Sequence, residues 1–157
     1  MLLIEITALR AKVFQDGAAA ALLAAGNTQG LRSYLNALAT PAYIVWKTSV
    51  DPNDIMSNGM DWTRVDNLSI GKARIWDWIT RLKDKNGNLA FNPSKANIRS
   101  GIDATWVGTA QDLAVRAVVY THCKRSATVA EKMMATGSGT DPSPSNMTIE
   151  GELNDSD

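Results

Sequence analysis

The chain has 157 residues, of which 45% are hydrophobic and 20% are charged, with 16 Lys and Arg against 16 Asp and Glu. These values are typical of one globular domain with a sizeable core, and the zero net charge argues against a dedicated nucleic-acid-binding protein, which usually has a basic excess. The single cysteine, Cys123, excludes an intrachain disulfide and a cysteine metal cluster.

The first 40 residues carry three helical patterns. Apolar residues recur with a helical period over residues 2–13, and an alanine- and leucine-rich run ends at Gly26, a typical C-terminal stop. A third pattern begins near Leu31 and ends before Thr40-Pro41, because a residue that precedes proline disfavours helix. The start has no basic region before its apolar core, and no stretch approaches about 18 apolar residues. We therefore expect a protein made in the cytoplasm, with no membrane partner.

Residues 42–50 (AYIVWKTSV) contain the only strand pattern, since they are rich in β-branched and aromatic side chains. Turn-forming residues follow over 51–62 without a clear period. A lone strand is only marginally stable. We therefore expect it to pair either with residues 62–65 or with another chain.

Two tryptophans stand two positions apart in the next helical pattern, residues 66–82. Trp76 and Trp78 would point about 200° apart on a helix, so they cannot contact the same neighbour. For Trp76, which lies off the main apolar stripe, two interpretations stay open: a contact with another protein, where aromatic residues are enriched, or a second core layer. The residues predicted to form one core are Ile75, Trp78, Ile79, Leu82, Leu113, Ala117 and Tyr120.

Three more helical patterns follow, and two of them begin with capping boxes, at Thr109 and Thr128. The helix after Thr109 is apolar nearly all round until Lys124 and Arg125, which suggests a central position. Beyond Gly137 the chain is rich in Gly, Ser, Pro and Asp, a composition that is disordered unless it lies on another surface.

The predicted fold class is mainly α: a compact helical bundle with one short extended strand or hairpin and an extended C-terminal arm. We expect about five to seven helices, mostly antiparallel neighbours because the connections are short. The predicted helical domain covers residues 1–137, with a strand and loop insertion at about 42–65, and the polar arm covers 138–157.

No residue pattern indicates an enzyme or a cofactor site. His122 and Cys123 are neighbours on one helix and point about 100° apart, so they do not form a compact catalytic pair, and we expect both to be structural. Asp51, Asp54 and Asp61 lack the spacing of a calcium loop. No phosphate-binding glycine motif and no G-x-S-x-G motif is present. We expect no cofactor, no metal and no enzymatic activity.

Four segments between residues 43 and 153 carry a family resemblance: YIVWKTSV, MDWTRVDNLSIGKARIWDWITRL, NIRSGIDATWVGTAQDLAVRAVVYTHCKRSATVAEKMMATGSGT and the closing EGEL. They resemble a family of small proteins encoded in the structural gene modules of tailed bacteriophages. The resemblance implies a non-enzymatic virion protein, located near the head–tail junction or among the tail completion factors.

The first functional interpretation is therefore a head–tail adaptor (connector or neck) subunit, made in the host cytoplasm and located in the virion. Such subunits form a homo-oligomeric ring on the portal protein, contact other neck and tail proteins, and let DNA pass without sequence-specific binding. One alternative is a tail-completion or tail-tube-associated protein, although a tube subunit would be rich in strands. Another is a small DNA-binding packaging or regulatory factor, for which the basic residues are the pair Lys124 and Arg125 and the group Lys72, Arg74 and Arg81. A further alternative, an enzyme built on His122 and Cys123, has no positive evidence in the sequence.

The expected interfaces lie in three places: the strand, the helix at 66–82 and the tail. Strand and tail are each suited to extend over a neighbouring subunit, by β-augmentation or by draping. The candidate interface residues are Tyr43, Val45, Trp46, Trp76, Met147, Ile149 and Leu153.

Overall fold

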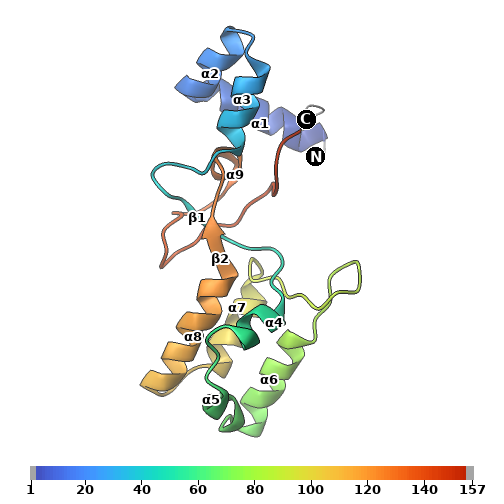
Figure 1. Cartoon of the computed structure of the whole chain (residues 1–157), viewed down its shortest axis with the longest axis vertical. Coiled ribbons are helices and arrows are strands. Elements are labelled where there is room, and N and C mark those ends of the chain that lie inside the picture. The colour runs from blue at the N-terminus through green and yellow to red at the C-terminus, as the bar shows by residue number, and fades with distance from the viewer. Residues whose placement is uncertain (1–2, 155–157) are drawn as a thin grey trace. The chain divides into compact units, whose positions relative to one another are not determined.

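The computed structural model describes the backbone of residues 3–154 and the side chains of residues 5–154. This part of the chain forms nine helices and two short strands that pair as an antiparallel sheet (Figure 1). The predicted fold class, mainly helical with an extended C-terminal arm, is confirmed. The described residues contain more helices than the sequence indicated, because several short turns are helical.

The chain divides into two compact units. The first unit contains the residues up to Val45 and those from Ser126 onward, and the second unit contains Trp46–Arg125. Both crossings fall inside short strands, β1 (Ile44–Trp46) and β2 (Lys124–Ser126). The sequence has no flexible linker where the chain passes from one unit to the other, because an ordered strand forms each connection.

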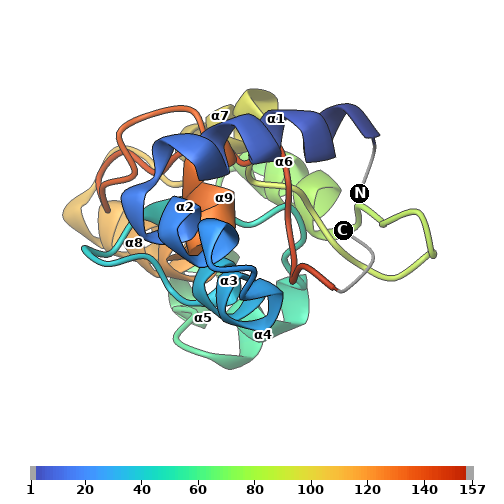
Figure 2. The ribbon, with the colours of Figure 1, turned by 90° about the horizontal axis from the view of Figure 1, so that it is seen from above.

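The first unit is built from four described helices, seen from above in Figure 2. Asp16 caps one of them by accepting a hydrogen bond from the Ala19 backbone N–H at 2.9 Å, and Asn27 caps the next by accepting one from Gly30 at 2.8 Å. The helices are α1 (Leu3–Gln15), α2 (Gly17–Ala24), α3 (Thr28–Asn36) and α9 (Val129–Met134).

The arm, which is the segment after Gly137, contains no helix or strand among its described residues, yet specific contacts hold it. Asn36 bonds to both backbone polar groups of Leu153: its Nδ2 donates to the carbonyl at 3.0 Å, and its Oδ1 accepts from the N–H at 2.9 Å. The buried Glu131 carboxylate accepts a hydrogen bond from the Gly151 N–H at 3.1 Å. Ile149 and Leu153 are buried against apolar residues of the four helices. The arm therefore packs against the unit to which it belongs.

The second unit contains five helices. The predicted capping box at Thr109 is confirmed: its side chain accepts from the Asp112 N–H, and the Asp112 carboxylate accepts from the Thr109 N–H. The last helix ends at Cys123 rather than at Arg125. The helices are α4 (Pro52–Ser57), α5 (Trp62–Asp66), α6 (Ile70–Thr80), α7 (Ala96–Thr105) and α8 (Ala110–Cys123).

The predicted strand is present but shorter, and its predicted pairing with residues 62–65 is wrong. Those residues form helix α5, whereas β1 pairs with β2, which starts at Lys124 where the sequence indicated the basic end of a helix. On the other edge of β1, the Ser145 N–H donates to the Ile44 carbonyl at 3.0 Å. β1 therefore has backbone partners on both edges, so β-augmentation by another chain would first have to displace one of them.

An aromatic core fills the second unit. Trp76 of α6 and Trp106, which follows α7, meet at 5.4 Å between ring centroids and 75° between planes, an edge-to-face pair. Helices α6 and α7 approach closely at Gly101, where a Cβ atom would lie 2.9 Å from the Ile79 Cδ1 atom. Phe91 is also buried in this core, and the short helices α4 and α5 pack against α8.

Candidate interaction surfaces

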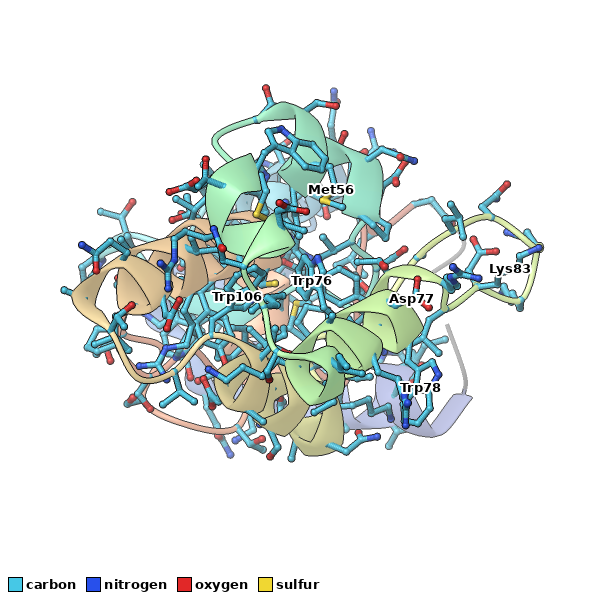
Figure 3. All side chains as sticks on the ribbon, turned by 90° about the horizontal axis from the view of Figure 1, so that it is seen from below. Met56, Trp76, Asp77, Trp78, Lys83 and Trp106 are labelled. Atoms are coloured by element: carbon cyan, nitrogen blue, oxygen red, sulfur yellow. The ribbon has the colours of Figure 1, made fainter. Side chains whose placement is uncertain are left out.

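On helix α6, the buried tryptophan and the exposed tryptophan are the reverse of the prediction. Trp76 is 4% exposed and lies beside Trp106, whereas Trp78 is 64% exposed and points outward (Figure 3). The assignment of Trp78 to the core is therefore wrong, and so is the choice of Trp76 as an interface residue. The alternative that placed Trp76 in a core layer is the correct one.

The reversal follows from where α6 begins and ends. The helix runs over Ile70–Thr80, so Leu68 lies before it and Leu82 lies beyond its C-cap. The apolar stripe counted through these two leucines is therefore not one helical face. Within the helix the buried pair is Trp76 and Ile79, three positions apart.

The other predicted core residues divide in the same way. Ile79 is buried, and Ile75 and Tyr120 pack against the core as predicted. On α8 the buried apolar residues include Val115 and Val119, four positions apart, which turns the opposite side of that helix toward solvent. Three further core assignments are wrong because the side chains are exposed: Leu82, Leu113 and Ala117.

The exposed side of α6 and the turn after it form the first candidate surface, which we call the Trp78 face. Its cations outnumber its carboxylates, and both carboxylates are engaged locally. Asp77 Oδ1 lies 2.6 Å from Arg81 Nε, and the Asp84 carboxylate accepts backbone N–H bonds from Asn86 at 2.8 Å and Asn88 at 2.9 Å. The surface is therefore both apolar and cationic. The Trp78 face consists of Ile70, Arg74, Trp78, Arg81, Leu82, Lys83 and Lys85, all exposed.

Helices α4 and α5 carry the second candidate surface, which we call the Trp62 face. Trp62 is 56% exposed, and the exposed charged side chains of residues 51–66 are all carboxylates. The one cation in residues 51–66, Arg64, is directed to Asp112, with 2.7 Å between Arg64 Nη2 and Asp112 Oδ1. The Trp62 face consists of Asp51, Asp54, Asp61, Trp62 and Asp66, all exposed.

The Arg64–Asp112 pair explains why the Trp62 face is negatively charged. The hydrogen bonds from Arg64 lower the pKa of the Asp112 carboxyl, against the opposite effect of its desolvation, and bonds from Thr109 lower it further. Because Arg64 is held by this carboxylate, it does not neutralise the aspartates of the Trp62 face.

A third surface is an apolar groove in the first unit, with a volume of about 660 Å³. Side chains of α1, α2, α3 and the arm line it, including Leu9, Leu35 and Leu153. Phe14, at its edge, is 69% exposed. Two arginines, Arg10 among them, are the only charged side chains of the lining.

Three of the candidate interface residues in the first unit are buried by their own chain. Val45 is 0% exposed, and Ile149 and Leu153 belong to the first unit's core, so their assignment to an interface is wrong. Tyr43 is half-buried, and its hydroxyl donates to the Gly137 carbonyl at 2.9 Å. The same hydroxyl lies 2.8 Å from the Ser145 Oγ atom, so the residue that precedes β1 contacts the arm within this unit.

The remaining candidates are half-buried. Met147 lies on the arm. Trp46, in the second unit, contacts the Tyr120 ring, at 5.4 Å between centroids, and the Arg99 guanidinium, which lies 5.0 Å from the Trp46 ring centroid. Both contacts are made within the unit.

His122 and Cys123 are directed differently, as neighbours on a helix should be. The His122 Nε2 atom lies 3.1 Å from the Asn58 carbonyl oxygen at the end of α4. Burial raises the pKa of the Cys123 thiol to about 12, so the thiol is protonated at neutral pH and is a poor nucleophile. Among the residues that the structure describes, no three His, Cys, Asp or Glu side chains are grouped to hold a metal ion.

None of the described helices is long and apolar enough to cross a membrane. No protein family, curated protein or solved structure matches the chain.

The sequence analysis missed two of the most exposed large apolar side chains of the second unit, Trp62 at 56% and Ile70 at 81%. Trp62 follows Asp61, a helix N-cap, and Ile70 follows Ser69, another N-cap residue. Reading these caps first would have started α6 at Ile70 and removed Leu68 from its stripe. That single change weakens the case for Trp78 as a core residue.

Proposed function

We propose that the protein is a non-enzymatic structural subunit of a tailed-bacteriophage virion that acts as a head–tail adaptor. In this role it forms a ring on the portal protein, contacts neck or tail proteins, and leaves a channel through which DNA passes without sequence-specific binding. The resemblance of residues 43–153 to phage structural proteins suggests the setting, and the exposed faces of the second unit suggest the mode of action.

The observation that carries the proposal is the exposure of Trp78. A tryptophan that is 64% exposed, with Ile70 at 81% and Leu82 at 40%, forms an apolar surface with arginines beside it. Tryptophan and arginine are the residues that most often supply binding energy in protein interfaces. Such a surface fits permanent attachment to another protein.

Tail completion remains the alternative of the same class. The helical fold argues against its tail-tube version, since a tube subunit is expected to be rich in strands. A DNA-binding factor is the second candidate, because Arg74, Arg81 and two lysines lie on one face. Duplex binding would then fall steeply with salt concentration, whereas an adaptor would show no sequence preference and weak binding.

The test is the composition of purified virions. Expressed in its phage, the protein should co-purify with particles at a fixed low copy number, as a ring subunit does. Trp78→Ala should reduce incorporation at least about tenfold, as loss of a central aromatic anchor does. The matched control is Leu38→Ala, which truncates an exposed apolar side chain of the first unit (65% exposed) and should leave incorporation unchanged. Absence of the wild-type protein from virions would refute the proposal.

A further inference from the structure

The two faces of the second unit carry opposite charge. The Trp78 face has four cations beside the carboxylates of Asp77 and Asp84, a net charge of +2 (four minus two), whereas the Trp62 face has four aspartates. One of the four cations, Arg81, pairs with Asp77, and the cation near the Trp62 face, Arg64, pairs with Asp112. The formal net charge of the chain is zero. The first face is therefore net basic and the second is net acidic.

The Trp78 side chain and helix α4, which carries part of the Trp62 face, lie on different sides of α6. Figure 3 shows Trp78 on the side of α6 away from Met56, a residue of α4. The opposite charges therefore do not neutralise each other within one chain. They are available to meet across two chains.

We propose that the Trp78 face of one copy docks on the Trp62 face of a second copy of this chain. The contact uses different surfaces on the two partners, and a repeated contact of this kind generates a ring when its rotation closes. The inference rests on the proposed function, since it supplies the contact from which the adaptor ring is built.

Charge complementarity favours this pairing over the symmetrical ones. Two Trp78 faces would bring cations together, and two Trp62 faces would bring carboxylates together, each at an energetic cost. In the head-to-tail contact, each partner contributes an exposed tryptophan, flanked by cations on one side and by carboxylates on the other. DNA would match the Trp78 face alone and would be repelled by the Trp62 face.

The experiment uses two charge-reversal variants of the full chain. The first, Arg74→Glu with Lys83→Glu, makes the Trp78 face acidic, so both faces repel each other. The second, Asp54→Lys and Asp66→Lys with Asp51→Asn and Asp61→Asn, makes the Trp62 face basic, with the same consequence, while asparagine keeps the two helix N-caps. An equimolar mixture restores complementarity, because each variant then meets a partner of opposite charge. Sedimentation velocity at low salt measures association, and circular dichroism verifies that each variant is folded.

We expect the wild type to self-associate, with a dissociation constant that rises at high salt. Each variant alone should bind itself at least about tenfold more weakly, and the mixture should return to within about threefold of the wild type. The control, Lys12→Glu with Lys95→Glu, reverses two exposed lysines outside both faces and should associate like the wild type.

A wild type that stays monomeric at high concentration and low salt, or a mixture that associates no better than its components, would overturn the inference. Virion composition is measured separately, so the adaptor function and this contact fail independently. Association that all the variants retain would likewise overturn it, because another surface would then form the contact.

Discussion

The two units of this chain are stabilised in different ways. The core of the second unit buries Trp76, Phe91 and Trp106, whereas the seven buried apolar residues that the structure describes in the first unit's core include no aromatic side chain. Two of those seven, Ile149 and Leu153, come from the arm, and a groove of about 660 Å³ lies beside Leu153. Aromatic packing therefore stabilises the second unit. The first unit needs the arm, which is distant in sequence, to complete its core.

The difference is open to direct measurement because all five tryptophans lie in the second unit, from Trp46 to Trp106. Tryptophan fluorescence therefore reports unfolding of the second unit, while far-UV circular dichroism reports helices of both units. A substitution that acts on one unit should affect the two signals differently.

The largest loss of stability is expected from removal of the Trp76–Trp106 pair. Trp76→Ala should lower the free energy of unfolding by roughly 3–5 kcal/mol, because it leaves a cavity against Trp106. Urea unfolding followed by tryptophan fluorescence measures it. Trp76→Phe is the matched control and should cost less, since the Trp76 indole N–H has no hydrogen-bond partner among the described residues and most of the ring volume is kept. A loss under about 1 kcal/mol for Trp76→Ala would show that this pair is not the centre of the core.

The next largest effect is expected in the first unit, where Asn36 holds the arm. Asn36→Ala removes both hydrogen bonds to the Leu153 backbone and should cost about 1–3 kcal/mol. Hydrogen exchange at the Leu153 amide should accelerate, while the tryptophan signal should hardly change. Ser33→Ala, an exposed position on the same helix, is the control. Unchanged exchange would mean that apolar contacts alone hold the arm.

A smaller, pH-dependent effect belongs to the second unit. Because the pKa of Asp112 is lowered in the folded state, this carboxylate stabilises the fold above its unfolded pKa of about 4. The contribution is lost as the pH falls through the lower folded pKa. Asp112→Asn should therefore lower the melting temperature at neutral pH and have a smaller effect near pH 3. Melting curves between pH 7 and pH 3, with the exposed Asp66→Asn as control, test this. An equal loss at both pH values would contradict the ion-pair explanation.

Local signals in the sequence predicted the helical class, the capping boxes at Thr109 and Thr128, and an extended arm. These features depend on a few neighbouring residues, so they can be recognised without tertiary information. The pairing of β1 with β2 depends on residues about 80 positions apart, and no local pattern encodes it. The same holds for the Asn36–Leu153 contact.

The error at α6 has a different cause. The sequence pattern assigns Leu68, Ile79 and Leu82 to one stripe with Trp78, but Ile79 also lies three positions from Trp76 and therefore fits a stripe with either tryptophan. Periodicity alone does not choose between such stripes. Trp106 made the choice in the folded chain, since its ring packs edge-to-face on Trp76. The buried side of α6 therefore reflects both the position at which the helix begins and a contact between residues 30 positions apart.

The smallest loss of stability is expected for Trp78→Ala, which can be compared with Trp76→Ala on the same helix. Trp78→Ala should change the free energy of unfolding by no more than about 0.5 kcal/mol, because the side chain is 64% exposed and leaves no cavity. Urea unfolding of Trp78→Ala beside Trp76→Ala measures the contrast at two positions of one helix. A near-neutral Trp78→Ala that also impairs incorporation into virions separates binding from folding at a single residue. A loss as large as that of Trp76→Ala would instead mean that α6 is buried on both sides, and the interface would then have to lie on the Trp62 face or on the groove of the first unit.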